Sequence, residues 1–291
     1  MNETIEISRG PFKATISPPL GGSLLSFTED LDVGTHHHLR PAPIGTNDVL
    51  QSACYPLVPF SNRVLNASFN WEGEQINLNP NFAPEPHMIH GHGWQNPWQI
   101  TEIQPNQACL SYRHQANNWP WSYEALLSYS LSVHGLTIQL SITNLSEENM
   151  PAGIGLHPFF PKQEQTIVIT DVEAIQLNDT NKHPVRIDKT HYALKQLQYG
   201  TSFPMGLDNC FINWSGHATI QNNRKLEIST SEIFSHMVLY TPNGQNFFCL
   251  EPVSHLNSAL NLKKNNCFEA GIIVLKPGET LSGNLSLLSI S

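Results

Sequence analysis

The sequence predicts an all-β protein, built as one large antiparallel β-sandwich with few short helices. Three observations predict this fold class: apolar residues alternate as they do in strands, many short apolar runs are separated by turn residues, and helical patterns are scarce. The period of the apolar pattern distinguishes a strand from a helix, because successive side chains of a strand point to opposite faces, whereas a helix repeats about every 3.6 residues. No change in composition marks a boundary, so we expect residues 1–291 to form a single domain.

The clearest strand pattern is a predicted hairpin in the middle of the chain. Residues 127–133 alternate between serine and apolar side chains, and residues 136–142 alternate again with the opposite parity. His134 and Gly135 separate the two runs, and such a break is typical of two antiparallel strands joined by a tight turn. The residues expected to face the core are Leu127, Tyr129, Leu131, Val133, Leu136, Ile138, Leu140 and Ile142.

Shorter runs of the same kind recur along the chain, and clusters of Gly, Pro, Asn and Asp lie between them. Many short strands with turn signals at this spacing are typical of a sandwich or a barrel. The runs are residues 13–18, 108–114, 166–177, 225–230, 236–241, 246–252 and 284–291.

The composition excludes several classes of protein. A 40% hydrophobic content with only 13% charged residues argues for a compact fold rather than disorder. The net charge of −9, with six arginines and no basic run, argues against a nucleic-acid partner. No apolar run approaches the roughly 20 residues that span a bilayer, so we expect no membrane segment.

The start of the chain and the cysteines predict a cytoplasmic protein. The first residues lack a charged segment followed by an apolar one, so no secretory signal is visible. The cysteines are odd in number and include no closely spaced pair, which predicts reduced thiols rather than disulfides or a cysteine-based zinc site. They are Cys54, Cys109, Cys210, Cys249 and Cys267.

Two residues are candidates for acid–base chemistry. Glu251 follows an apolar stretch, Phe247 to Leu250, and burial there would raise the pKa of its carboxyl toward the range of a general base. The alternative interpretation is that Glu251 is a glutamate at the end of a strand, held in an ion pair. His157 lies between apolar residues and is followed by Pro158; it is either a core histidine or an acid–base group.

Other polar and aromatic residues have two interpretations each. His87, His90 and His92 form an HxxHxH pattern, which is either a metal site or a glycine-containing loop. Arg63 either points its fork of donors into a cleft, where it would suit sugar hydroxyls or a carboxylate, or forms a structural ion pair. The tryptophans at 94, 98, 119 and 121 are either core residues or a platform for a sugar ring.

Five motifs, in this order along the chain, resemble those of the aldose 1-epimerase (galactose mutarotase) family. The order matters because each motif alone is short and weakly specific. The motifs are Asn62-Arg63-Val64, Ile89-His90-Gly91, the segment Leu156 to Phe160, the segment Leu207 to Phe211, and Cys249-Leu250-Glu251.

The resemblance implies a role for one residue of each motif. It implies that Glu251 is the general base, that His157 is the general acid, and that Arg63, His90 and Asp208 hold the sugar. It also implies the galactose mutarotase-like supersandwich, with no metal and no organic cofactor. The chain departs from the family pattern at His92, where the family has glycine, and at Val238, where the family often has a glutamine. These departures leave the preferred sugar open.

The expected function is therefore the interconversion of the α and β anomers of a free aldohexose. Ring opening and reclosure would need Glu251 and His157 to face each other across a groove wide enough for one hexose. The expected partner is a small-molecule sugar, and the protein would be a monomer or a homodimer. Three alternatives stay open: a hexose-6-phosphate 1-epimerase, a non-catalytic carbohydrate-binding protein on the same fold, and a metallohydrolase that uses the three histidines.

Overall fold

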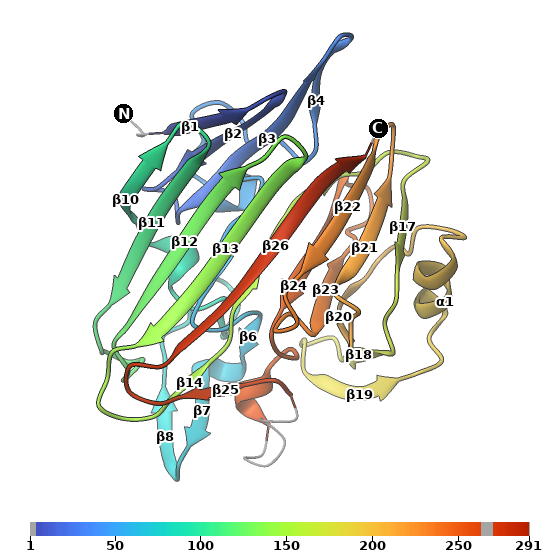
Figure 1. Cartoon of the computed structure of the whole chain (residues 1–291). Helices are drawn as coiled ribbons and strands as arrows, with labels where there is room; N and C mark the ends of the chain where they lie inside the picture. Colours follow the sequence, from blue (N-terminus) through green and yellow to red (C-terminus); the bar gives the residue numbers. More distant parts are fainter. Residues whose placement is uncertain (1–3, 263–269, 291) are drawn as a thin grey trace.

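Two eight-stranded antiparallel sheets make up most of the molecule, which we describe from a computed structural model at residues 4–262 and 270–290 (Figure 1). The first sheet faces the viewer in Figure 1. Its strands, in spatial order, are β10 (Gln99–Gln104), β11 (Gln107–His114), β12 (Tyr123–Leu131), β13 (Gly135–Asn144), β26 (Thr280–Ile290), β22 (Lys225–Thr230), β21 (His217–Gln221) and β17 (Ile167–Thr170).

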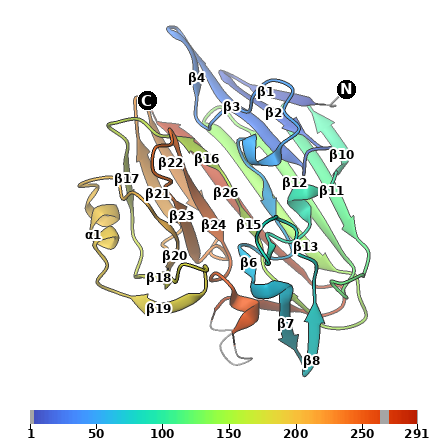
Figure 2. The same cartoon turned by 180° about the vertical axis from the view of Figure 1, so that it is seen from behind.

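The second sheet lies behind the first and is nearer to the viewer in Figure 2. Its strand β24 (Phe247–Val253) pairs with β23 on one side and with the two short strands β15 and β16 on the other. The remaining members are β19 (Pro184–Asp188), β18 (Ala174–Asn178), β20 (Asp208–Ile212), β23 (His236–Tyr240), β15 (Gly155–Leu156), β16 (Phe159–Pro161) and β5 (Pro56–Leu57).

Smaller sheets and short helices complete the described chain. A four-stranded sheet holds β1 (Ile5–Arg9), β2 (Phe12–Ser17), β3 (Ser23–Leu31) and β4 (Gly34–His37). Three two-stranded sheets pair β6 (Arg63–Val64) with β9 (Met88–Ile89), β7 (Ser68–Trp71) with β8 (Glu74–Asn77), and β14 (Met150–Ala152) with β25 (Ile273–Leu275). The helices are α1 (Tyr192–Tyr199) and the 3-10 turns Val49–Gln51, Leu65–Ala67, Gly93–Gln95 and Ala259–Asn261.

The predicted hairpin is confirmed as β12 and β13. The two strands pair from Tyr123 with Asn144 to Leu131 with Leu136, and their alternating apolar side chains are buried. Val133 is an exception, because it lies in the connecting turn and its side chain is 55% exposed. The alternation continues two residues past the end of the strand, so the pattern alone overstated its length.

The run at residues 166–177 forms two strands rather than one. β17 belongs to the first sheet and β18 to the second, and residues 171–173 carry the chain between them. Asp171 accepts a backbone hydrogen bond from Ser215 through its carbonyl, outside either ladder. The apolar pattern of residues 166–177 is continuous although the chain passes from the first sheet to the second, because β17 and β18 both face the core between the two sheets.

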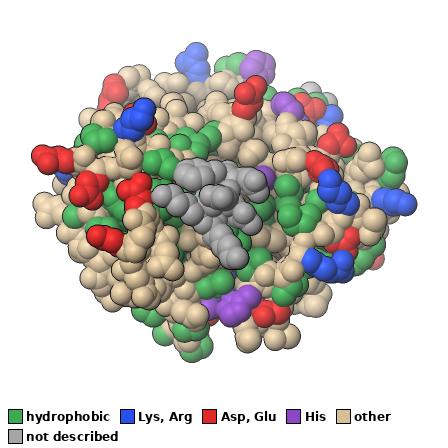
Figure 3. Space-filling view, turned by 90° about the horizontal axis from the view of Figure 1, so that it is seen from below, with side chains coloured by type: hydrophobic (Ala, Val, Ile, Leu, Met, Phe, Trp, Pro, Cys, Tyr) green, Lys and Arg blue, Asp and Glu red, His purple; other side chains and the backbone are tan. Residues whose placement is uncertain are grey.

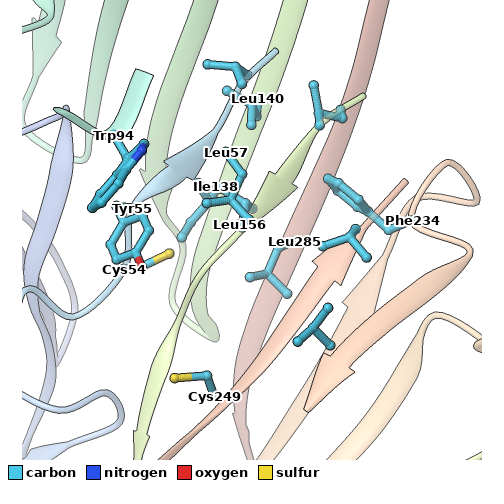
Figure 4. Packing of buried hydrophobic residues seen from close by; sticks show 14 of the residues in the cluster. Cys54, Tyr55, Leu57, Trp94, Ile138, Leu140, Leu156, Phe234, Cys249 and Leu285 are labelled. Atoms are coloured by element: carbon cyan, nitrogen blue, oxygen red, sulfur yellow. The ribbon is translucent and has the colours of Figure 1, made fainter. Parts of the chain in front are cut away.

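The core lies between the two sheets. Figure 4 shows Ile138 and Leu140 of β13 and Leu285 of β26 beside Leu156 of β15 and Leu57 of β5. All five side chains are fully buried. Truncating one such leucine to alanine typically costs about 2–5 kcal/mol, so this layer contributes much of the stability of the fold.

Several of the fourteen histidines hold the backbone of tight turns. A backbone N–H that belongs to no strand ladder needs an acceptor, and an unprotonated ring nitrogen provides one. Three of the four donors are asparagines in the left-handed conformation, with φ between 52° and 55°. The pairs are Asn62 N–H to His90, Asn66 N–H to His87, Asn213 N–H to His236, and Ser61 N–H to His255.

Other expectations concern the thiols and the surface. Cys54, Cys109, Cys210 and Cys249 are free thiols, and Cys267 lies outside the described residues. None of the described helices is long and apolar enough to cross a membrane. On the face shown in Figure 3, Lys and Arg side chains lie among acidic ones rather than in one basic patch.

Candidate active site

A cavity of about 740 Å³ contains all five residues predicted from the sequence. They come from separate parts of the chain: Glu251 from β24, His157 from the break between β15 and β16, and Asp208 from β20. Arg63 lies on β6, and His90 follows β9, the partner strand of β6. The structure therefore brings together the residues of all five motifs.

Sheet geometry explains why Glu251 and His157 are neighbours. β24 pairs with β15 through Val253 and Gly155, and with β16 through Cys249 and Phe159. Continuing this register places His157 opposite Glu251, in the gap between the two short strands. Side chains of directly opposed residues share a face of the sheet, with their Cβ atoms about 5 Å apart. Accordingly, His157 Nε2 lies 3.3 Å from Glu251 Oε1.

This separation changes one expectation. A hexose does not fit between groups 3.3 Å apart, so the prediction that the two residues face each other across a groove is wrong. Both instead line one cavity, where their side chains are in contact. The reason is that adjacent strands hold them, whereas the sequence placed them on independent segments.

The His157 ring is held between two aromatic rings. Tyr55 stacks on it at 4.5 Å between centroids and Phe159 at 4.7 Å. The ring is 8% exposed, and its Nδ1 is buried with no hydrogen-bond partner among the described residues. Burial disfavours the imidazolium and lowers the pKa of His157 to about 3. The ring is thus held rigidly in its neutral form.

Burial has the opposite effect on the partner carboxyl. Glu251 is 3% exposed, and its neighbour across β23 is the apolar Val238. Burial, and next the negative charge of Asp208, raise the pKa of Glu251 well above its usual value, while Arg63 opposes the shift. Burial of the pair therefore favours a neutral carboxyl beside a neutral imidazole.

The charged binding candidates already hold partners. Arg63 donates two hydrogen bonds to the carboxylate of Glu85, from Nε at 2.8 Å and from Nη2 at 3.0 Å. Asp208 Oδ2 accepts a hydrogen bond from Lys182 Nζ at 2.8 Å. The ion-pair interpretation of Arg63 is therefore confirmed, and the residue also lines the cavity.

His90 presents a fixed tautomer to the cavity. Its Nδ1 accepts the backbone N–H of Asn62 at 3.0 Å, so the proton of the neutral ring sits on Nε2. Burial lowers the pKa of His90 well below its usual value. The turn behind it is tight: a Cβ on Gly91 would lie 2.2 Å from the carbonyl oxygen of Val58. His90 is therefore a neutral hydrogen-bond donor.

The HxxHxH segment does not form a metal site. Its three side chains separate: His87 holds the backbone of Asn66, His90 lines the cavity of about 740 Å³, and His92 stacks on His114 with ring centroids 4.2 Å apart. No group of three His, Cys, Asp or Glu suited to a metal occurs within residues 4–262 and 270–290. His92 lines a second cavity of about 300 Å³, whereas Trp94 lines the first.

Several residues of the cavity were not predicted. Glu85 lies between two prolines, and Lys182 lies in the turn between β18 and β19, so neither carries a pattern that points to its partner. The others lie on loops or strand ends of irregular sequence. They are Arg40, Leu50, Gln51, Tyr55, Phe82, Pro242, Asn243 and Gln245. Asn62, Ile89 and Phe159, which also line the cavity, lie in the motifs named from the sequence, and Tyr240, Asn246 and Phe247 lie in runs expected to form strands.

Comparisons with known proteins support one family. Residues 3–288 match the family model described as aldose 1-epimerase. The chain is 28% identical to the uncharacterized protein YphB of Escherichia coli K12, over 97% of both chains. Among solved structures, it is 27% identical to an Escherichia coli K12 protein for which aldose 1-epimerase activity has been proposed; the TM-score is 0.89 and the match covers 99% of both chains.

A more distant likeness concerns the fold alone. A galactose mutarotase-like protein from Clostridium acetobutylicum is 21% identical, with a TM-score of 0.84 over 99% of this chain and 95% of that one. Together with the two large antiparallel sheets, these likenesses confirm the predicted galactose mutarotase-like sandwich. Since the family model spans nearly the whole chain, this protein belongs to the aldose 1-epimerase family.

Proposed function

We propose that this protein is an isomerase that interconverts the α and β anomers of a free, unphosphorylated aldose. The observation that carries the proposal is the contact between Glu251 and His157, 3.3 Å apart, within a cavity large enough for one sugar ring. In this proposal Glu251 is the general base, His157 is the general acid, and Arg63, His90 and Asp208 hold the sugar.

The adjacency of the two groups suits the anomeric carbon. The hydroxyl oxygen O1 and the ring oxygen O5 are both bonded to C1, so two neighbouring side chains reach both at once. Glu251 takes the proton of O1 while His157 gives a proton to O5, and the C1–O5 bond opens to the free aldehyde. Rotation about C1–C2 presents the other face of the carbonyl, and the reversed proton transfers close the ring as the other anomer.

The reaction needs no proton from solvent. The neutral pair and the ion pair of ionised Glu251 with protonated His157 contain the same number of protons, so they differ only by a shift across 3.3 Å. Burial by itself favours the neutral pair. A sugar that donates O1–H to Glu251 and accepts at O5 stabilises the charged form, because hydrogen bonds to a charged group favour it. The substrate itself thus prepares the reactive state.

Two of the earlier alternatives are less well supported. Arg63 and Lys182 each hold a carboxylate, so they do not form the free cation cluster that a phosphate group normally needs. A purely sugar-binding protein does not require an acid and a base in contact, although it would use the same cavity.

Polarimetry tests the proposed activity. The optical rotation of freshly dissolved α-glucose or α-galactose is expected to reach equilibrium faster with catalytic amounts of the protein than in buffer alone. The final rotation should not change, because a catalyst leaves the equilibrium between anomers unaltered. Saturable sugar binding with no acceleration for any aldose would instead identify a carbohydrate-binding protein.

Replacing Arg63 by glutamine is expected to raise KM by about 10-fold, with a smaller change in kcat. Arg63 would hold the sugar without touching the reacting atoms, and losing a charge-assisted hydrogen bond weakens binding by about this factor. Initial rates over a range of sugar concentrations measure both constants. The double variant Arg63→Gln/Glu85→Gln separates the lost donor from the stranded carboxylate, and Arg113→Gln on β11 serves as a control. A fall in kcat at unchanged KM would contradict the binding role.

A further inference from the structure

Arg40 is the unpaired cation among the charged side chains of the cavity. Arg63 is neutralised by Glu85 and Lys182 by Asp208, while Glu251 contacts His157. Within the described parts of the chain, no carboxylate lies within 4.0 Å of the Arg40 guanidinium. The cavity thus carries one positive charge that has no ionic partner among the residues that the structure describes.

The guanidinium is held firmly in place. It lies over the rings of Phe159 and Phe247, 3.9 and 4.5 Å from their centroids. Its Nη2 donates to the carbonyl oxygens of Leu50 at 2.6 Å and Ser52 at 2.9 Å. These contacts use one of the two terminal nitrogens, and Nη1 forms no hydrogen bond with the described residues. A guanidinium fixed in this way loses little conformational entropy when it binds an anion.

The nearest elements add donors rather than negative charge. The 3-10 turn at Val49–Gln51 contributes the amide of Gln51, and the turn between β23 and β24 contributes Gln245 and Asn246, all exposed and lining the cavity. Asp48 acts on Arg40 only at longer range, and its side chain accepts the backbone N–H of Leu50. An anionic group at this mouth of the cavity would meet one cation and several neutral amides.

We propose that the site takes an aldose that carries one carboxylate, as a uronic acid does, and that Arg40 binds this carboxylate. The inference rests on the proposed function in treating the cavity as a sugar site. A carboxylate carries one negative charge and matches the single unpaired guanidinium, and arginine donors suit its two oxygens. A phosphate dianion would leave one charge uncompensated here. The ion pairs of Arg63 with Glu85 and of Lys182 with Asp208 are then left for hydroxyl groups.

Calorimetric titration with methyl glycosides tests whether Arg40 binds a sugar carboxylate, and it does so without relying on catalysis. A methyl glycoside has no O1 proton, so it occupies the site but cannot open its ring. Methyl glucuronide is expected to bind the wild-type protein about 10-fold or more tightly than methyl glucoside, the factor expected for a charge-assisted hydrogen bond. Equal affinity for the two glycosides, or no binding of the glucuronide, would overturn the proposal.

Variants assign the preference to Arg40. In Arg40→Gln the preference for the glucuronide should fall to within about 2-fold, since the charge is gone, and in Arg40→Lys it should be intermediate, since the fork is lost. Arg186→Gln removes an exposed arginine of β19 outside the cavity and should keep the wild-type ratio. A preference that survives Arg40→Gln in a protein with a wild-type circular dichroism spectrum excludes the role of Arg40.

Comparing substrates separates this inference from the proposed function. Polarimetry with glucuronate, glucose and glucose 6-phosphate is expected to give the highest kcat/KM for glucuronate. Acceleration of glucose with no preference for glucuronate would refute the inference and leave the epimerase activity standing. Tight binding of methyl glucuronide with no acceleration of any sugar would support Arg40 and refute the activity. Preference for the phosphate would refute the carboxylate as the group recognised.

Discussion

Replacing Glu251 by glutamine is expected to lower kcat for mutarotation by about 10²–10⁴-fold, the usual contribution of a positioned general base. Glutamine has nearly the same shape but cannot accept the O1 proton. Binding of the sugar should change less, because the other cavity residues keep their positions. Rates of change of optical rotation at saturating sugar, for the variant beside the wild type, measure the loss.

Two further variants sharpen this test. Glu227→Gln makes the same chemical change on β22, where Glu227 pairs with Lys225 outside the cavity, and should keep wild-type turnover. His157→Asn should be about as slow as Glu251→Gln, and the double variant little slower than either, because the two groups act as one proton-transfer unit. Turnover of Glu251→Gln within about 3-fold of the wild type would remove the base from the mechanism.

Acid is expected to destabilise the protein through its buried histidines. Burial lowers the pKa of both His236 and His255 to about 4, whereas an unfolded histidine titrates near 6.5. Between these values the unfolded chain binds more protons, so this stability is fully present above pH 6.5 and is lost as the pH falls toward 4. The two groups together should lower the free energy of unfolding by about 3–4 kcal/mol between pH 7 and pH 5.

Urea unfolding at pH 7, 6 and 5 measures this loss, and one variant isolates it. In His255→Gln an amide oxygen replaces the ring nitrogen that accepts the N–H of Ser61, but the group no longer titrates. The fall in stability should shrink by about 2 kcal/mol, the share of one such histidine, because the other buried histidines still titrate. The raised pKa of Glu251 works in the opposite direction, since its contribution is lost as the pH rises, but it is common to both proteins and cancels in the difference. An equal fall in wild type and variant would show that His255 does not carry the effect.

The sequence predicted the parts of the structure that depend on local pattern. Alternation located the hairpin of β12 and β13, and the five short motifs led to residues that line one cavity. It did not give the contact between Glu251 and His157, because that follows from pairing β24 with two short strands whose own patterns are too brief to read.

The main feature that the sequence did not predict is the set of ion-pair partners of the charged cavity residues. Glu85 lies 22 residues from Arg63, and Lys182 lies 26 residues from Asp208, so only folding brings each pair together. A charged residue in a loop looks the same in the sequence whether it is solvated or paired. For this reason Arg40, beside a run of three histidines, gave no sign that it would be the unpaired cation.

The row of paired residues that crosses the second sheet separates two tasks of the protein. The sheet alone sets the distance between the carboxyl and the imidazole, whereas much of the remaining cavity lining comes from connecting loops. Loops tolerate substitution and insertion far better than the ladder beneath them. Changes in these loops can therefore alter which molecules the cavity accepts, while the pairing that holds Glu251 beside His157 stays the same.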